Sequence, residues 1–326
     1  MAEKSYAFAV GNIRARENRL LKQTDIEQLL SFNNAYECAA FLKDKGYGEN
    51  NADNSVSSLL SAEEKKLWSY IKELAPDFSV FDAFIVVNDF HNLKAAIKGT
   101  ATGKPFDHLL ISPSLTEQAV IIDAVTQKNF AILPEFLRDA AQKSWEILIK
   151  TRDSQASDAV LDAACLEMRF KAASDIKIPM LKEMVCASVF FDNIKVALRC
   201  AAAKKNRDFI QNSLIDTDAL KKADLVSAAL QGTDVVLELL EKASAYSGAQ
   251  AAEAFRTSPS QFEKFVDNYM MRVAIKGKYI PVGAEPLIAY LQAKLAELKT
   301  VRIAVNAVTS SADRNTVREM LRELYG

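Results

Sequence analysis

Apolar residues recur along most of the chain at spacings of three and four, the period of an amphipathic α-helix. The longest stripe begins after Pro286 and reaches Val308, which predicts one long helix buried on one side. Its charged positions should face away from the core, and they are Lys294, Glu297, Lys299 and Arg302. No stretch sustains strict alternation of apolar and polar residues, and the β-rich run 84–87 lies within helical periodicity. The pattern therefore predicts an all-α fold.

Three helix starts of similar sequence stand about a hundred residues apart, at Thr24, Thr116 and Thr217. Each combines a hydroxyl that can accept hydrogen bonds from free N–H groups with an acid that complements the helix dipole. A second amphipathic helix follows each start. These second helices are predicted over residues 35–44, 130–141 and 235–245.

A short block of residues also repeats along the chain. Residues 92–98 align with residues 193–199, and the second half of the pattern returns at residues 300–305. Pro179 and Pro286 stand where helices carrying this block would begin, as expected of proline in a first helical turn. The alternative is a chance likeness between Ala-rich helices, but the common order of elements favours three tandem helical repeats. The predicted repeats cover residues 1–106, 107–209 and 210–326.

Charge and composition narrow the classes of function. Lys and Arg number 41 against 42 Asp and Glu, so the chain lacks the basic surplus of a nucleic-acid-binding protein. Only 10 Gly and 8 Pro among 326 residues leave few turns, which favours long helices. The four cysteines are widely spaced in apolar stretches, which predicts reduced, buried thiols. We expect no signal peptide and no membrane helix, so any membrane association should be peripheral.

One segment invites comparison with a phosphate loop. In residues 99–104 the glycines stand too close together for a nucleotide P-loop, and Lys104 is followed by Pro105 instead of Ser or Thr. We therefore interpret Gly99 as a helix C-cap and residues 103–105 as a turn. No bound nucleotide is expected.

Candidate catalytic and metal-binding residues are equally weak. His91 and His108 are far apart and no Cys-x-x-Cys pair occurs, so His91 is interpreted as a solvated or interface residue. Glu63 and Glu64 are interpreted as acids at a helix start that complement the dipole. We predict no catalytic residue, no metal site and no cofactor.

A basic side marks the N-terminal helix, which is predicted over residues 4–22. The basic residues are Arg14, Arg16, Arg19 and Lys22. This side could meet an acidic partner or lipid headgroups, although a solvated helix face is the commoner meaning of such a pattern.

Three widely separated segments together resemble a known family. They are YAFAVGNIRAR at residues 6–16, NDFHNLKA at 88–95 with TGKPF at 102–106, and EPLIAYLQAK at 285–294 with VRI at 301–303. In these segments the chain resembles the C subunits of prokaryotic V/A-type ATPases, whose counterpart in the vacuolar enzyme is known as the d subunit.

The resemblance implies a funnel of three similar helical domains with pseudo-threefold symmetry. It also implies a non-catalytic, peripheral subunit at the cytoplasmic face of the membrane. Its partners would be the central-stalk subunits and the ring of proteolipid subunits, between which it would pass torque as a socket. The family members bind no nucleotide themselves.

Repeated polar positions are the candidates for the socket. We expect them to line or support it, and they are Asp89, Asn92, Lys94, Asn193, Lys195, Glu285 and Arg302. The competing interpretation places the Asn residues and the bases that follow them on solvated helix sides.

Two other classes of function stay open at the level of sequence. One is a cytosolic helical-repeat adaptor, which co-purification with a rotary ATPase would exclude. The other is an all-α enzyme acting on an isoprenoid or similar substrate, which would need a carboxylate cluster that the sequence lacks.

Overall fold

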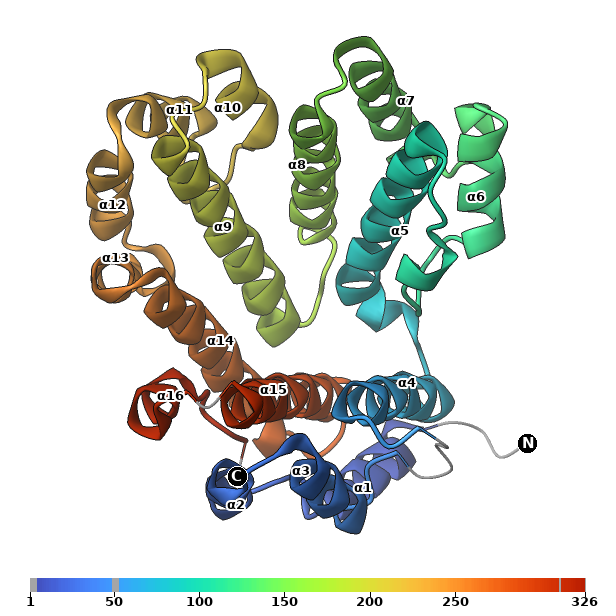
Figure 1. The fold of residues 1–326 in the computed structure, drawn as a ribbon, viewed down its shortest axis with the longest axis vertical. Coiled ribbons are helices and arrows are strands. Elements are labelled where there is room, and N and C mark those ends of the chain that lie inside the picture. The colour runs from blue at the N-terminus through green and yellow to red at the C-terminus, as the bar shows by residue number, and fades with distance from the viewer. Residues whose placement is uncertain (1–4, 49–52, 311, 326) are drawn as a thin grey trace. The chain divides into compact units, whose positions relative to one another are not determined.

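The computed structural model describes residues 5–48, 53–310 and 312–325, and within these ranges the chain is helical and contains no strand (Figure 1). The all-α prediction is confirmed. None of the helices in these ranges is both long and apolar enough to cross a bilayer. All four cysteines are free thiols, of which Cys186 is half-buried and the other three are buried.

The helices fall into two compact units. Unit 1 comprises Met1–Val80, Ile178–Met184 and Ala254–Gly326, and unit 2 comprises Phe81–Lys177 and Val185–Glu253. The division into three repeats at residues 106 and 209 stays a prediction.

Unit 1 is built on one long helix, α15 (Glu285–Thr309), which packs against helices from both ends of the chain. Its core joins Leu298 and Val301 of α15 to Leu29, Leu42 and Leu60. The helices that surround α15 are α1 (Tyr6–Glu17), α2 (Gln23–Ser31), α3 (Ala35–Asp44), α4 (Val56–Leu74), α14 (Pro259–Ile275) and α16 (Arg314–Met320).

The burial of α15 differs from the expectation. The sequence predicted burial on one side with all four charges facing away from the core. Lys299 and Arg302 are exposed as predicted, but Lys294 and Glu297 are buried. The reason is that α15 has packed neighbours around it, and the two charges are paired inside the unit.

Unit 2 is centred on α8 (Ser154–Ala172), which packs against α5 (Asp82–Thr102), α7 (Glu135–Thr151) and α10 (Arg207–Ser213). Its core includes Phe90, Leu93, Leu137 and Leu161. The remaining helices of unit 2 are α6 (Gln118–Thr126), α11 (Lys222–Gln231) and α12 (Thr233–Lys242).

Two helices contribute residues to both units, α9 (Pro179–Ala202) and α13 (Gly248–Thr257). Short 3-10 turns complete the described elements. They are η1 (Ser79–Phe81), η2 (Asp107–Leu109), η3 (Phe130–Ile132), η4 (Ala245–Ser247) and η5 (Lys276–Tyr279).

Local capping explains where several helices begin. The Asn34 side chain accepts from Glu37 N at 2.9 Å, so α3 begins at Ala35, as predicted. Pro179 and Pro286 lie in the first turns of α9 and α15, also as predicted.

The third predicted helix start, at Thr217, is wrong. Thr217 forms a local turn in which its hydroxyl accepts from Leu220 N at 3.2 Å. Helix α11 begins only at Lys222, whose N–H donates to Asp216 at 2.9 Å. The hydroxyl is used by the turn, so it cannot cap the helix.

The predicted C-cap at Gly99 is also wrong. Helix α5 continues to Thr102 and ends at Gly103, which has the left-handed φ of 67° that a C-capping glycine adopts. Gly99 lies inside the helix, and glycine fits there because Phe106 packs where a Cβ would be, with its Cδ1 at 2.1 Å from that position.

Other boundaries are shifted by local chemistry. The element predicted over 130–141 is a 3-10 turn followed by α7, because Pro134 separates the two. The N-terminal helix is shorter than predicted and covers Tyr6–Glu17, while Lys4 lies outside the described residues.

Candidate functional site

Asp89 and Asn92 lie on α5 and attach the following connection to that helix. Both side chains are fully buried. The Asp89 carboxylate accepts hydrogen bonds from Leu115 N at 2.8 Å and Thr116 N at 2.6 Å. The Asn92 amide donates to Ile111 O at 2.9 Å and accepts from Ile111 N at 2.7 Å. These two predicted site residues lie one turn apart on α5, and together they hold the loop of residues 111–116 at two points.

Asn193 of α9 makes the same paired contact at the corresponding position of the repeated block. Its amide donates to Ile215 O at 2.9 Å and accepts from Ile215 N at 3.1 Å. The third copy of the block differs, since the Thr300 hydroxyl donates to Ala296 O of its own helix at 2.8 Å. The first two copies therefore each hold a loop, and the third does not.

Lys94 and Lys195 are half-buried and carry ion pairs inside unit 2. Lys94 Nζ lies 2.6 Å from Oδ1 of Asp162, which joins α5 to α8. Lys195 Nζ lies 2.8 Å from Oδ1 of Asp192, three residues earlier on α9. Neither charge is entirely available to a partner without loosening these pairs.

The remaining predicted residues, Glu285 and Arg302, lie on α15 in unit 1. Glu285 is half-buried in the first turn, where its charge complements the helix dipole. Arg302 is exposed and makes no ion pair with any residue of the ranges 5–48, 53–310 and 312–325. It is the predicted cation most open to a partner.

Unit 1 also contains a buried ion network that the sequence analysis did not predict. Lys294 and Glu297 of α15 are 6% and 1% exposed, and Lys294 Nζ lies 2.6 Å from Glu297 Oε1. The Glu297 carboxylate also accepts from Leu21 N at 2.6 Å and from the Tyr47 hydroxyl. Several donors thus compensate the burial of its charge.

Glu63 extends this network from α4. One carboxylate oxygen lies 3.3 Å from Lys294 Nζ and the other lies 4.0 Å from Lys66 Nζ. The prediction that Glu63 complements a helix start is wrong, because α4 begins at Val56 and Glu63 lies well inside it. Its side chain, only 12% exposed, is directed at the buried lysine of α15.

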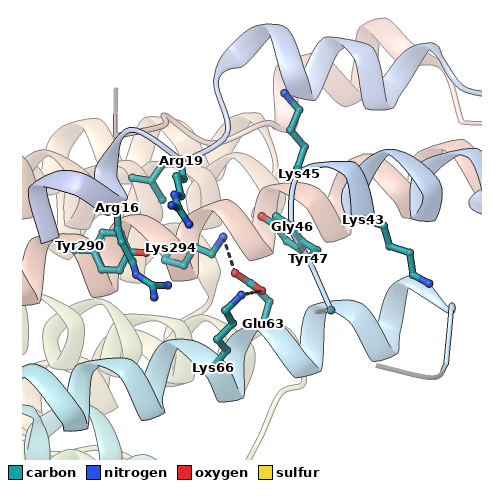
Figure 2. A pocket seen from close by; sticks show the side chains of 12 residues that line it. Arg16, Arg19, Lys43, Lys45, Gly46, Tyr47, Glu63, Lys66, Tyr290 and Lys294 are labelled. Atoms are coloured by element: carbon teal, nitrogen blue, oxygen red, sulfur yellow. Dashed lines mark ion pairs between the residues drawn. The ribbon is translucent and has the colours of Figure 1, made fainter. Parts of the chain in front are cut away.

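Glu63, Lys66 and Lys294 border a cavity of about 500 Å³ in unit 1, which we call the basic cavity (Figure 2). Figure 2 shows four cationic side chains around the space beside Glu63, while Lys43 and Lys45 extend away from it. Glu63 is the one carboxylate among the described lining residues. The four cations that surround it are Arg16, Arg19, Lys66 and Lys294.

Burial controls the protonation of the tyrosines in this region. It raises the pKa of Tyr47 well above the ordinary value, and the charge of Glu297 raises that pKa further. Burial also raises the pKa of Tyr290, against the opposing charge of Arg16. The Tyr47 hydroxyl therefore stays protonated at neutral pH and donates to Glu297.

The sequence did hold one signal for the network. Lys294 and Glu297 stand three residues apart, a spacing that is typical of exposed helix pairs. However, apolar residues fill most helix positions from 286 to 308, including those next to Lys294 and Glu297. A helix with so wide an apolar surface is buried over most of its circumference, and a charged residue within that surface needs a partner.

The structure also places the residues considered for catalysis and metal binding. His91 is half-buried, and its Nε2 lies 2.9 Å from Leu109 O. Among the residues whose placement is described, no group of His, Cys, Asp and Glu side chains could hold a metal ion.

Comparison with known proteins gives a consistent result across the chain. The family described as ATP synthase (C/AC39) subunit matches residues 9–320. The C subunit of the V-type sodium ATPase of Enterococcus hirae is 23% identical over 318 residues, which cover 96% of this chain and 97% of the relative. The C subunit of the V-type ATP synthase of Thermus thermophilus is 22% identical, with the same coverage of 96% and 97%. The C subunit of the A-type ATP synthase of Methanobrevibacter smithii is 22% identical over 97% of this chain and 88% of the relative.

Proposed function

Since the chain belongs to the family of ATP synthase (C/AC39) subunits, we propose that it forms the socket between the central stalk and the membrane ring of a V/A-type rotary ATPase. It is a non-catalytic subunit of such an ATPase. The observation that carries the proposal is the family match, which extends over residues 9–320.

The build of the chain suits the transfer of torque. A socket must resist twisting, and tightly packed helices are stiffer than exposed loops with few buried contacts. Helix α15 supplies such a body in unit 1, because helices from both ends of the chain pack against it and Lys294 pairs with Glu297 inside the unit. The low Gly content of 10 residues agrees with this stiffness.

The partners follow from the proposed position. One side would contact the central-stalk subunits and the other the proteolipid ring, with the chain held peripherally at the cytoplasmic face of the membrane. Nucleotide and nucleic acid are not expected as ligands of this chain. Arg302, Glu285, Lys94 and Lys195 are proposed as contacts with the stalk. The buried residues Asp89, Asn92 and Asn193 are proposed to support the socket by holding its loops.

Affinity purification tests the proposal directly. The tagged chain would be recovered from native membranes solubilised in mild detergent, and its companions identified by mass spectrometry. We expect catalytic, stalk and proteolipid subunits together. Recovery of the chain alone, or only with unrelated proteins, would instead favour the adaptor function.

Charge reversal tests the proposed contacts. The triple variant Lys94→Glu, Lys195→Glu, Arg302→Glu should weaken stalk binding about tenfold or more, since like charges placed across an interface repel. Reversal of the exposed lysines Lys150 and Lys171, which also pair with carboxylates, is the matched control.

Because Lys94 and Lys195 have internal ion pairs, Arg302→Glu alone separates contact from structure. It should weaken binding without lowering the free energy of unfolding. Unchanged affinity in the triple variant would remove these residues from the socket.

A further inference from the structure

The basic cavity has more positive charge than its own carboxylate compensates. Lys294 is neutralised by Glu297 and shares Glu63 with Lys66. The two arginines find no carboxylate among the residues that the structure describes. The Arg16 guanidinium stacks over the Tyr70 ring at 3.8 Å, and Arg19 is exposed without an ion pair in the same ranges.

Fixed guanidinium groups favour one kind of ligand. The planar fork of an arginine matches the oxygen spacing of phosphate or carboxylate, and hydrogen bonds between opposite charges are the strongest in proteins. Arg16 is held in place by its stacking on Tyr70, so it loses little freedom on binding. Lys66 adds an ammonium from the facing helix α4 (Figure 2).

Size and lining narrow the class of anion. A volume of about 500 Å³ lies within the range of small-molecule sites, which is more than one phosphate group needs. The Tyr47 and Tyr290 rings are only 3% and 6% exposed, so they offer no open face on which a base could stack. The volume and the lining of the basic cavity therefore fit several linked phosphate groups without a nucleoside.

Two backbone amides at the glycine turn of the cavity are already used within the chain. Gly46 N donates to Lys43 O at 2.8 Å, and Tyr47 N donates to Leu42 O at 3.0 Å, so both amides close the end of α3. Recognition would rest on the side chains of the cavity, and substitution of these side chains can test it without changing the backbone.

We propose that the basic cavity binds an oligophosphate anion, with Arg16, Arg19 and Lys66 as its direct contacts. The Glu63 carboxylate on the cavity wall opposes binding and limits affinity, because it lies among the same cations. The anion is either a free oligophosphate or the headgroup of a multiply phosphorylated lipid, and the chemistry recognised is the same.

Titration calorimetry of the full chain with inorganic tripolyphosphate at low salt tests the proposal. Arg19→Ala removes a side chain with no ion pair to lose in the described ranges and should weaken binding about tenfold. Glu63→Gln should tighten it about threefold or more, because a repelling charge is removed. Arg207→Ala removes an exposed arginine of α10 outside the cavity and should leave binding unchanged.

A vesicle experiment distinguishes the two sources of the anion, and a folding control accompanies it. Flotation with phosphatidylcholine vesicles containing phosphatidylinositol bisphosphate would assign the site to a lipid headgroup, whereas binding of tripolyphosphate alone would assign it to a soluble anion. Circular dichroism confirms that each variant is folded. The proposal is overturned by the absence of saturable binding to both probes, by equal losses in Arg19→Ala and Arg207→Ala, or by equally tight binding of polyglutamate.

Discussion

Glu297 is the residue on which most of the polar core of unit 1 depends. Its carboxylate accepts from Lys294, Leu21 N and the Tyr47 hydroxyl while it is only 1% exposed. A buried charge with these partners stabilises little by itself, but its removal leaves the partners unsatisfied. The position is therefore intolerant of substitution although it has no catalytic role.

Glu297→Gln should lower the free energy of unfolding by about 3 kcal/mol, since Lys294 loses a partner and Leu21 N faces an amide that can also donate. Urea denaturation measures the change. Glu64→Gln, next to Glu63 on the same helix, is the control and should cost less than about 0.5 kcal/mol. Equal costs would show that the network is not important for stability.

Tyr47 makes unit 1 sensitive to alkaline pH. Its pKa is raised in the folded state, so the folded chain holds this proton more tightly than the unfolded chain. The contribution is complete below the ordinary pKa of about 10 and is lost as pH rises toward the folded pKa. Because the unfolded chain has released this proton and the folded chain still holds it, the free energy of unfolding falls by about 1.4 kcal/mol per pH unit in that window.

Tyr47→Phe should therefore show a shallower loss of stability above about pH 10 than the unsubstituted chain. Urea midpoints measured from neutral to alkaline pH give both slopes. Other groups that titrate in the same window cancel in the comparison. Parallel slopes would mean that Tyr47 is not protected from ionisation.

For single residues, the sequence shows which positions recur but not which groups they contact. The repeated block identified Asn92 and Asn193, yet their partners are backbone groups 19 and 22 residues further along. Backbone groups have no sequence signature, so no pattern could mark them. Lys294 and Glu297 were misplaced for a related reason, because the burial of a charge depends on neighbours that are remote in sequence.

Several element boundaries were predictable from local signals. Helix α3 begins at Ala35 because Asn34 caps it, and α9 begins at Pro179. The prediction failed at Thr217, whose hydroxyl forms a local turn with Leu220 instead of capping a helix. A capping residue indicates a helix only when the next turn of chain is free to become helical.

The loops held by Asn92 and Asn193 should differ in their sensitivity to substitution. Ile215 is 5% exposed, whereas Ile111 is 37% exposed, so water can replace the lost bonds only at Ile111. Asn193→Ala should cost about 2–3 kcal/mol and Asn92→Ala about 1 kcal/mol.

Denaturant titration of the two variants measures this difference. Hydrogen exchange of the Ile111 and Ile215 amides, each of which donates to its asparagine, locates it. If Asn92→Ala proves the more costly, then burial of the backbone partner does not set the energy.

The whole molecule consists of two compact units, and the polar network belongs to unit 1 alone. Stability need not be uniform in such a chain, because local openings follow cooperative units. The sequence predicted its helical class but not this partition, since unit 1 joins residues from both ends of the chain.

Hydrogen exchange of Glu297→Gln should consequently change in one unit only. Faster exchange is expected across α2, α4 and α15, while α5, α7 and α8 should keep the rates of the unsubstituted chain. Mass spectrometry of peptic fragments resolves these segments. A uniform rise in exchange through both sets of helices would show that the chain unfolds as one cooperative body.

The packing of α15 against the early helices has a consequence for synthesis on the ribosome. Tyr47 and its partner Glu297 are separated by 250 residues, which at about 5–20 residues per second take roughly 12–50 s to translate. For most of that interval Leu29, Leu42 and Leu60 have been made without the helix that covers them, whereas α5, α7 and α8 are complete much sooner. The first helices to be made are thus among the last to be buried, and a nascent chain of this protein presents them to chaperones for most of its translation.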